Sequence, residues 1–328
     1  MATASNEGCR IIVTRTLPGA LMDLFRAAGH CWINPEERTL DATEVAQQAA
    51  ALGADTVVVM ALDRVDARLI RMLPDSVRVV ATYSVGHDHI DLAAAQERGI
   101  AVLSTPDVLS DAVADMGMLL LLGAARRAYE AMQLLYSGAW QGWSPMQVIG
   151  RDLTGGRLGV LGMGRIGQAV AHRARHGFGM EVHYHNRSRL PDGLEGGATF
   201  HERLQDLLPL SDFLMLAAPS SPATRGILGA EAIQQLPHGA VVANVSRGDL
   251  VDDDALIAAL RSGRVMAAGL DVFNGEPAIH PGYLKLPNVF LQPHQGSSTI
   301  ETRLRMGSLL LDSIERFRAG QAVGNRLA

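Results

Sequence analysis

Three glycines in the segment VLGMGRIGQAV have the spacing of a phosphate-binding turn. Gly162, Gly164 and Gly167 form a G-x-G-x-x-G pattern that follows an apolar run and opens an amphipathic one, the context that gives this pattern meaning. Gly162 permits a tight turn, Gly164 lets the backbone approach a pyrophosphate, and Gly167 lets helix and strand pack closely. The helix start offers N–H groups and a positive dipole end to phosphates. We therefore predict a dinucleotide site rather than a glycine-rich turn without a ligand. The predicted cofactor contacts in this turn are Gly162, Met163, Gly164, Arg165, Ile166 and Gly167.

A second feature that could contact a nucleotide lies in HYHNRSRL, residues 183–190. A fold that binds NAD usually places here an acidic residue that bonds the ribose 2′-OH. Asn186 stands there instead, and Arg187 and Arg189 project to the same side if the segment is extended. Two guanidinium groups with Ser188 between them suit a 2′-phosphate, which carries about −1.5 to −2 charges and which an acidic residue would repel. We predict NADP(H) as the preferred cofactor and NAD(H) as the weaker alternative. A solvated loop with incidental arginines is the competing interpretation.

The histidines do not by themselves indicate a site. The pairs His87/His89 and His183/His185 are not joined by a cluster of Cys or carboxylate ligands, so no metal is predicted. On its own, His294 would more often be structural than catalytic.

Alternating apolar and amphipathic stretches must position these residues. RIIVTR, TVVVMA, VRVVATYS and IAVLST alternate with helical patterns, and a second series begins at Arg157 with RLGVLG, EVHYHN, FLMLAA, AVVANVSR, MAAGLDV and NVFLQPH. This order predicts βαβ units and parallel sheets covered by helices on both faces. We expect one long helix over about 107–136, an irregular arm over 137–156 and a last helix over about 297–319. The predicted fold class is α/β, with two Rossmann-like or flavodoxin-like domains.

Composition narrows the function classes. The 328 residues are 48% hydrophobic and 19% charged, enough for two cores. A net charge of −5 gives no sign of attraction to nucleic acid or to an anionic membrane. The strongest apolar run, 116–125, has about half the length of a bilayer span. Two cysteines outside any CxxC pair favour a reducing compartment, so we expect a cytoplasmic protein.

Several separate motifs, taken in order, resemble those of the D-2-hydroxyacid dehydrogenase family, and most closely its glyoxylate/hydroxypyruvate reductase branch. They are YSVGHDHID, TPDVLSDAVAD, GAWQGW, LGMGRIGQ, NVSRGDLVDDDAL, GLDVFNGEP and LQPHQGSS, from about residue 79 to 302. The resemblance implies that Arg247, Glu276 and His294 are catalytic. His294 would donate a proton to the carbonyl oxygen of a 2-oxo acid, and Glu276 would hold its ring and favour the protonated form. Arg247 would bind the substrate carboxylate and polarise the carbonyl.

The resemblance also implies contacts outside this triad. It places the substrate carboxylate on the backbone N–H groups of Val85 and Gly86, where glycine permits close approach. Asp271 matches the family's contact to the nicotinamide carboxamide. The remaining predicted cofactor contacts are Asn186, Arg187, Ser188, Arg189, Pro219, Val245, Ser246, Asp271 and Gly296. Val113 could pack near the nicotinamide or serve only the core. Two residues depart from the family pattern: Gln295 stands where an aliphatic residue is commoner, and Asp115 where glutamate is commoner.

The implied layout is discontinuous. Residues 1–105 with 297–328 would form the substrate-binding domain and 106–296 the NAD(P)-binding domain, with an active-site cleft between them. The segment around Trp140 and Trp143 resembles the family's dimer contact, so a homodimer is expected. Whether Trp143 reaches a partner's active site or packs in its own subunit stays open.

The expected activity is NADPH-dependent reduction of a small 2-oxo acid, of the glyoxylate or hydroxypyruvate type, to the D-2-hydroxy acid. The first alternative keeps the chemistry on a larger acid of the phenylpyruvate or 2-ketogluconate type, because the loops 60–63 and SVGHDH cannot be sized from the sequence. Formate or phosphite oxidation, found in relatives, is less favoured by the motifs. A non-enzymatic, dinucleotide-sensing protein similar to a corepressor is the alternative from another class.

Overall fold

The computed structural model describes residues 8–328, which divide into two units, each built on its own parallel sheet. The first unit holds the described residues up to Leu109 together with Ser297–Ala328, and the second holds Ser110–Gly296. The predicted α/β class with two parallel sheets is confirmed. No helix within residues 8–328 is long and apolar enough to cross a membrane.

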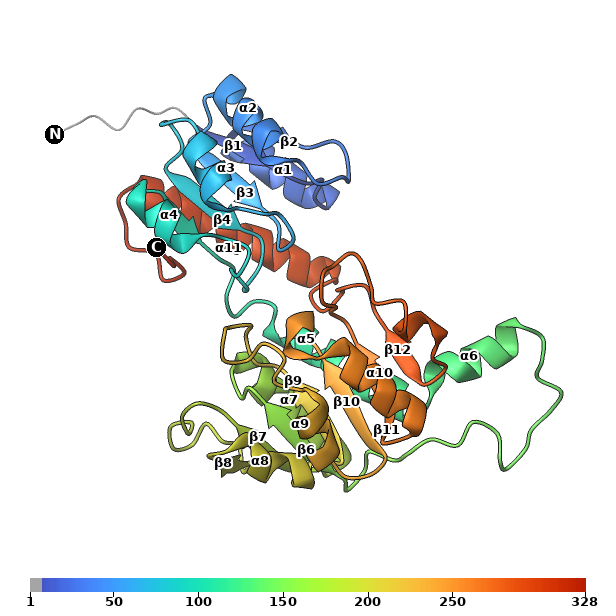
Figure 1. Cartoon of the computed structure of the whole chain (residues 1–328). Coiled ribbons are helices and arrows are strands. Elements are labelled where there is room, and N and C mark those ends of the chain that lie inside the picture. Colours follow the sequence, from blue (N-terminus) through green and yellow to red (C-terminus); the bar gives the residue numbers. More distant parts are fainter. Residues whose placement is uncertain (1–7) are drawn as a thin grey trace. The chain divides into compact units, whose positions relative to one another are not determined.

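The first unit has a five-stranded sheet in the order β2-β1-β3-β4-β5, the order found in flavodoxin-like folds. Its elements are β1 (Cys9–Val13), α1 (Gly19–Ala28), β2 (Gly29–Ile33), α2 (Ala42–Leu52), β3 (Thr56–Val59), α3 (Ala67–Met72), β4 (Val79–Thr82), α4 (Leu92–Glu97), β5 (Ala101–Leu103) and α11 (Ile300–Arg318). Helices α2, α3 and α4 share a core with alternate residues of the strands. The C-terminal helix α11 packs against α1 and contacts β4 and β5 (Figure 1, red helix among blue elements).

The second unit has a seven-stranded parallel sheet in the order β12-β11-β10-β9-β6-β7-β8. Its elements are α5 (Ser110–Ala125), α6 (Ala128–Tyr136), β6 (Arg157–Leu161), α7 (Arg165–Phe178), β7 (Glu181–His185), β8 (Thr199–His201), α8 (Leu204–Leu207), β9 (Phe213–Leu216), α9 (Ala230–Gln235), β10 (Ala240–Asn244), α10 (Asp253–Ser262), β11 (Val265–Leu270) and β12 (Val289–Leu291), with short 3₁₀ turns at Leu208–Leu210, Gly248–Leu250 and Tyr283–Lys285. This is the doubly wound 3-2-1-4-5-6 order with a seventh strand, and the order reverses between β6 and β9. In such a sheet ligands bind at the carboxyl ends of the strands beside the reversal, which is where the glycine turn lies.

Helices cover both faces of this second sheet. Helices α8, α9 and α10 share one core with the strands. Helix α5 packs against α7, β10 and β11. A Cβ on Gly269 of β11 would lie 2.4 Å from the carbonyl oxygen of Leu120, so α5 approaches the sheet directly.

The elements differ from the sequence analysis in three respects. The helix predicted over 107–136 is two helices, α5 and α6, interrupted at Arg126 and Arg127, and Arg127 has a left-handed φ of 51°. The edge strands β2 and β8 were missed, because both are short and only partly buried. The segment after β7 is not extended, since the strand ends at His185 and a bend follows. The arm over 137–156 contains no helix or strand, as predicted.

Candidate active site

The glycine turn joins β6 to α7 and has no room for side chains at two of its three glycines. Gly162 has φ of 98°, and a Cβ there would lie 2.4 Å from the nitrogen of Ala218. A Cβ on Gly167 would lie 2.2 Å from the carbonyl oxygen of Gly162. Gly164 differs, because no atom lies within 4 Å of its Cβ position, and it caps α7 without any side-chain hydrogen bond. Open space beside an uncapped helix start is what a pyrophosphate requires, so these residues fit a dinucleotide. The other predicted contacts here lie in the turn or in the first turn of α7: Met163, Arg165 and Ile166.

Asn186 ties the end of β7 to this turn. Its Oδ1 accepts a hydrogen bond from the N–H of Met163 at 2.7 Å, and the N–H of Gly162 donates to the carbonyl of His185 at 3.0 Å. Asn186 therefore shapes the turn, a role that the sequence alone did not indicate. Because a bend begins at Arg187, the alternation of an extended strand does not decide where the two arginines point.

The two arginines, both exposed, have different partners. The guanidinium of Arg189 donates from Nε to Oε1 of Glu195 at 2.8 Å and from Nη2 to Oε2 at 2.9 Å. Within residues 8–328 Arg187 forms no ion pair. One of the two predicted phosphate-binding residues thus already has a carboxylate partner.

His294 and Glu276 form a hydrogen-bonded pair in the loops after β12 and β11. The Nδ1 atom of His294 lies 2.7 Å from Oε2 of Glu276, whose Oε1 accepts the N–H of Phe273 at 2.7 Å. Burial alone would raise the pKa of Glu276, but the hydrogen bond and charge of His294, the Phe273 N–H and the charge of Arg247 together lower that pKa. The carboxylate is therefore ionised at neutral pH. Because it engages Nδ1, Nε2 is the ring atom left to exchange a proton with a substrate.

Arg247 lies after β10 in a loop that the buried Asn244 shapes. The Nδ2 of Asn244 donates to the carbonyl of Arg247 at 2.8 Å, and its Oδ1 accepts the N–H of Ser246 at 3.0 Å. Val245, the first residue of this loop, is buried and donates its N–H to the carbonyl of Leu216. The sequence analysis did not identify Asn244 as a functional residue. A polar residue closing the fully buried strand AVVAN was the available signal.

Gly248 brings the loop of Arg247 against the loop of Glu276. A Cβ on Gly248 would lie 1.9 Å from the carbonyl carbon of Phe273 and 2.2 Å from the nitrogen of Asn274. These are backbone atoms, so no side chain could move aside. The close approach places Arg247 near enough for its charge to lower the pKa of Glu276. The three residues predicted as catalytic are thus gathered at the carboxyl edge of one sheet.

Asp271 holds the loop of His294 through its carboxylate and its backbone carbonyl. Its two carboxylate oxygens accept the N–H groups of Gln295 at 2.6 Å and Gly296 at 2.7 Å, and its carbonyl accepts the N–H of His294 at 2.8 Å. These bonds hold His294 at a left-handed φ of 54°, a conformation that costs a non-glycine residue about 1–3 kcal/mol. Burial raises the pKa of Asp271 to about 6, although the two N–H groups and His294 oppose the rise. The contact to a carboxamide stays a prediction, and the structure adds this positioning role.

The remaining predicted contacts of the second unit lie where its strands end. Pro219 is exposed after β9, and its carbonyl accepts the hydroxyl of Thr224 at 2.7 Å. Gly296 adjoins Val113, since a Cβ on the glycine would lie 3.2 Å from Cγ2 of the valine. Any larger residue at 296 would press on α5.

In the first unit the predicted substrate loop follows β4. The hydroxyl of Thr82 lies 2.6 Å from that of Ser84, and Ser84 donates to the carbonyl of Gly86 at 2.6 Å, which fixes the backbone around Val85. Thr82 also lies 3.0 Å from Nε2 of the His89 ring. These bonds leave Val85 and Gly86 in a loop held by buried hydroxyl groups.

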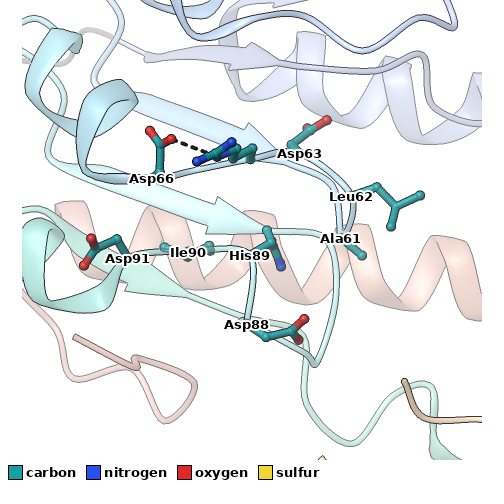
Figure 2. Close-up of a pocket in the computed structure, with 9 residues that line it drawn as sticks. Ala61, Leu62, Asp63, Asp66, Asp88, His89, Ile90 and Asp91 are labelled. Carbon is teal, nitrogen blue, oxygen red and sulfur yellow. Dashed lines mark ion pairs between the residues drawn. The ribbon is translucent and has the colours of Figure 1, made fainter. Parts of the chain in front are cut away.

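A pocket of about 440 Å³ opens beside this loop (Figure 2). It is lined by Ala61–Arg64, Asp66 and Asp88–Asp91. Asp63 fixes one wall, because its Oδ2 accepts the N–H of Met60 at 2.9 Å and its Oδ1 pairs with Arg15 at 2.9 Å. One of the two loops expected to limit substrate size, 60–63, is therefore held by the contacts of Asp63.

Both histidines of the pair His183/His185 contact His201. Nδ1 of His183 lies 3.0 Å from Nε2 of His201, and Nδ1 of His185 lies 2.9 Å from the carbonyl of His201. Between residues 8 and 328 no group of three or more His, Cys, Asp or Glu side chains is arranged to hold a metal ion.

Comparison with known proteins assigns the family. Residues 118–296 match the family model of the D-isomer specific 2-hydroxyacid dehydrogenase, NAD binding domain. The chain is 39% identical over 321 residues to a glycerate dehydrogenase of Hyphomicrobium methylovorum, covering 97% of this chain and 99% of the relative. It is 37% identical over 316 residues to a glyoxylate reductase of Thermococcus gammatolerans, covering 95% and 93%.

Solved structures agree with this assignment. The crystal structure of an NADPH-dependent glyoxylate/hydroxypyruvate reductase from Sinorhizobium meliloti, in complex with NADP and malonate, matches with a TM-score of 0.83 at 31% identity, covering 98% of this chain and 97% of that one. The chain belongs to the D-isomer specific 2-hydroxyacid dehydrogenase family. The family resemblance drawn from the motifs is confirmed, and with it an oxidoreductase with a nicotinamide-dinucleotide-binding domain.

Proposed function

We propose that this protein catalyses the NADPH-dependent reduction of a small 2-oxo acid, of the glyoxylate or hydroxypyruvate type, to the D-2-hydroxy acid. The observation that carries the proposal is the 2.7 Å contact between His294 and Glu276 beside the charge of Arg247. Relatives named glycerate dehydrogenase and glyoxylate reductase support this substrate class.

Each of the three residues has a defined task. The bound nicotinamide cofactor supplies the hydride. His294 donates a proton from Nε2 to the carbonyl oxygen as negative charge gathers there. Glu276 holds Nδ1, so the ring keeps one orientation during that transfer. Arg247 binds the substrate carboxylate and polarises the carbonyl with its planar fork of donors.

The preference for NADPH is part of the proposal. Asn186 replaces the acidic residue that would repel a 2′-phosphate, and Arg187 supplies an exposed guanidinium beside it. The Sinorhizobium meliloti relative, whose name says NADPH-dependent, supports this choice. We further propose that residues 106–296 bind the nucleotide and that 1–105 with 297–328 bind substrate through the N–H groups of Val85 and Gly86.

We also propose that the protein is a homodimer and that it resides in the cytoplasm. Large apolar side chains are exposed on α6 and the following arm, among them Leu135, Tyr136, Trp140 and Trp143, and an interface would cover them. The two cysteines are unpaired, which supports a reducing compartment.

The experiment is a steady-state assay of the loss of nicotinamide absorbance with hydroxypyruvate and with glyoxylate, each with NADPH and NADH. We expect turnover of at least one acid with a higher kcat/KM for NADPH. Turnover mainly with NADH would refute the cofactor assignment and leave the triad standing. Turnover only with phenylpyruvate or 2-ketogluconate would replace the substrate class, and none at all would refute the enzymatic proposal.

A further inference from the structure

Glu195 binds one of the two arginines that the proposed 2′-phosphate site depends on. Its carboxylate receives both Nε and Nη2 of Arg189, at 2.8 and 2.9 Å. This is the parallel two-bond geometry in which guanidinium and carboxylate pair most strongly. That edge of the guanidinium is therefore occupied before any nucleotide arrives.

The carboxylate is anchored more firmly than the arginine. The hydroxyl of Tyr184, whose residue is fully buried in β7, donates to Oε1 of Glu195 at 2.7 Å and accepts the N–H of Leu190 at 3.1 Å. The Glu195 side chain is 17% exposed, whereas that of Arg189 is 62% exposed. Strand β7 thus fixes the acidic side chain, and the acidic side chain fixes the arginine.

Glu195 stays charged throughout the physiological range. The hydrogen bonds from Arg189 and Tyr184 lower its pKa to about 2. The charges of Arg187, Arg189 and Glu195 then sum to +1 instead of the +2 of the arginines alone. A 2′-phosphate would meet Arg187, which forms no ion pair within residues 8–328, together with an arginine that is already paired and a fixed negative charge.

From this geometry we infer that Glu195 is a specificity-determining residue that weakens the selection for the 2′-phosphorylated cofactor by holding Arg189. The inference rests on the proposed function, since it assumes that the 2′-phosphate binds beside Arg187. Within that site, Arg187 is the main phosphate ligand, and NADH remains a usable cofactor because the site is only partly positive.

The test measures nucleotide binding by calorimetry, apart from turnover. The probes are adenosine 2′,5′-bisphosphate and, as the reference without a 2′-phosphate, 5′-AMP. Glu195→Gln removes the charge while keeping the shape. Glu44→Gln is the matched control, because Glu44 also accepts two hydrogen bonds from one arginine, here from Nη1 and Nη2 of Arg38. Glu44 likewise has a pKa of about 2, and it lies in the other unit.

We expect Glu195→Gln to tighten the bisphosphate by about three- to tenfold, the size typical of one exposed charge, with 5′-AMP unchanged. The ratio of kcat/KM for NADPH over NADH should rise by the same factor, and Glu44→Gln should change neither. Bisphosphate binding that is unchanged or weaker in a folded Glu195→Gln variant would overturn the inference.

Arg189→Ala provides a second and independent readout. If Glu195 holds Arg189 away from the phosphate, Arg189→Ala should weaken bisphosphate binding more in the Glu195→Gln background than in the wild type. Equal losses in the two backgrounds would refute the holding role. Arg187→Ala tests the proposed 2′-phosphate site separately from the role of Glu195. If this variant binds the bisphosphate as tightly as the wild type, Arg187 is not a phosphate ligand and the proposed site is wrong, whatever the role of Glu195.

Discussion

Gly248→Ala should disable the enzyme although the glycine contributes no functional group. The added Cβ would lie 1.9 Å from the carbonyl carbon of Phe273, and Cβ atoms do not approach backbone closer than 3.0 Å. The loops of Arg247 and Glu276 must therefore separate by about 1.1 Å (3.0 − 1.9). A misplacement of about 1 Å can cost about 100-fold in rate, equivalent to roughly 2.7 kcal/mol. The overpacked backbone should also cost about 1–3 kcal/mol of stability.

The assay is kcat/KM for hydroxypyruvate at saturating NADPH, with circular dichroism to show that the variant is folded. Gly177→Ala is the matched control, since Gly177 lies in α7 with no atom within 4 Å of its Cβ position. We expect its kcat/KM to stay within about twofold and its stability to rise by up to about 1 kcal/mol, the helix propensity difference. A folded Gly248→Ala variant that keeps kcat/KM within threefold of the wild type would refute the argument that this close approach assembles the triad.

Two further predictions concern the groups around His294. Glu276→Gln replaces a charged hydrogen bond with a neutral one, so kcat should fall by about 10- to 100-fold, the equivalent of roughly 1.4–2.7 kcal/mol. The KM for NADPH should stay within twofold. Steady-state kinetics measure both constants, and a kcat within threefold of the wild type would contradict the positioning role. The pKa of Asp271 is about 6 in the folded protein, against an ordinary value of 3.8. Its contribution to the free energy of unfolding is therefore complete below about pH 3.8 and is lost as the pH rises through 6, a change of roughly 3 kcal/mol. Denaturant unfolding should therefore show the stability of the wild type falling relative to Asp271→Asn between pH 4 and 7, and parallel pH profiles for the two proteins would contradict this.

The order of strands and helices was largely readable from the sequence because it depends on hydrophobic periodicity. Both βα series and the glycine turn were placed correctly. The elements that the sequence did not predict lack a periodic hydrophobic pattern. Strand β8 has only three residues, none of them fully buried, and β2 lies at an edge with no fully buried position. The break between α5 and α6 falls on two arginines, Arg126 and Arg127, with neither glycine nor proline to mark it.

The identities of the candidate catalytic residues came from motif resemblance, but the parts that support them came only from the structure. Asn244 acts locally, through the backbone two and three residues further along the chain. Gly248 and Asp271 act through backbone contacts between segments that are distant in sequence, such as the 25 positions between Asp271 and Gly296. No local pattern encodes such a contact. The nearest sequence signal is a buried polar residue at the end of an apolar strand. It identifies the residue but not its hydrogen-bond partner.

The cofactor site shows why counting charged residues in a motif is not enough. Arg187 and Arg189 are equivalent in NRSR, and both suit a phosphate by residue type. The chain then turns back over residues 190–195 and gives one of them a carboxylate that β7 holds through Tyr184. Selectivity between NADPH and NADH depends on the difference between two binding free energies, so in the proposed 2′-phosphate site a fixed negative charge counts alongside the arginines. The inference drawn from Glu195 therefore assigns part of this selectivity to a residue outside the motif that predicted the site.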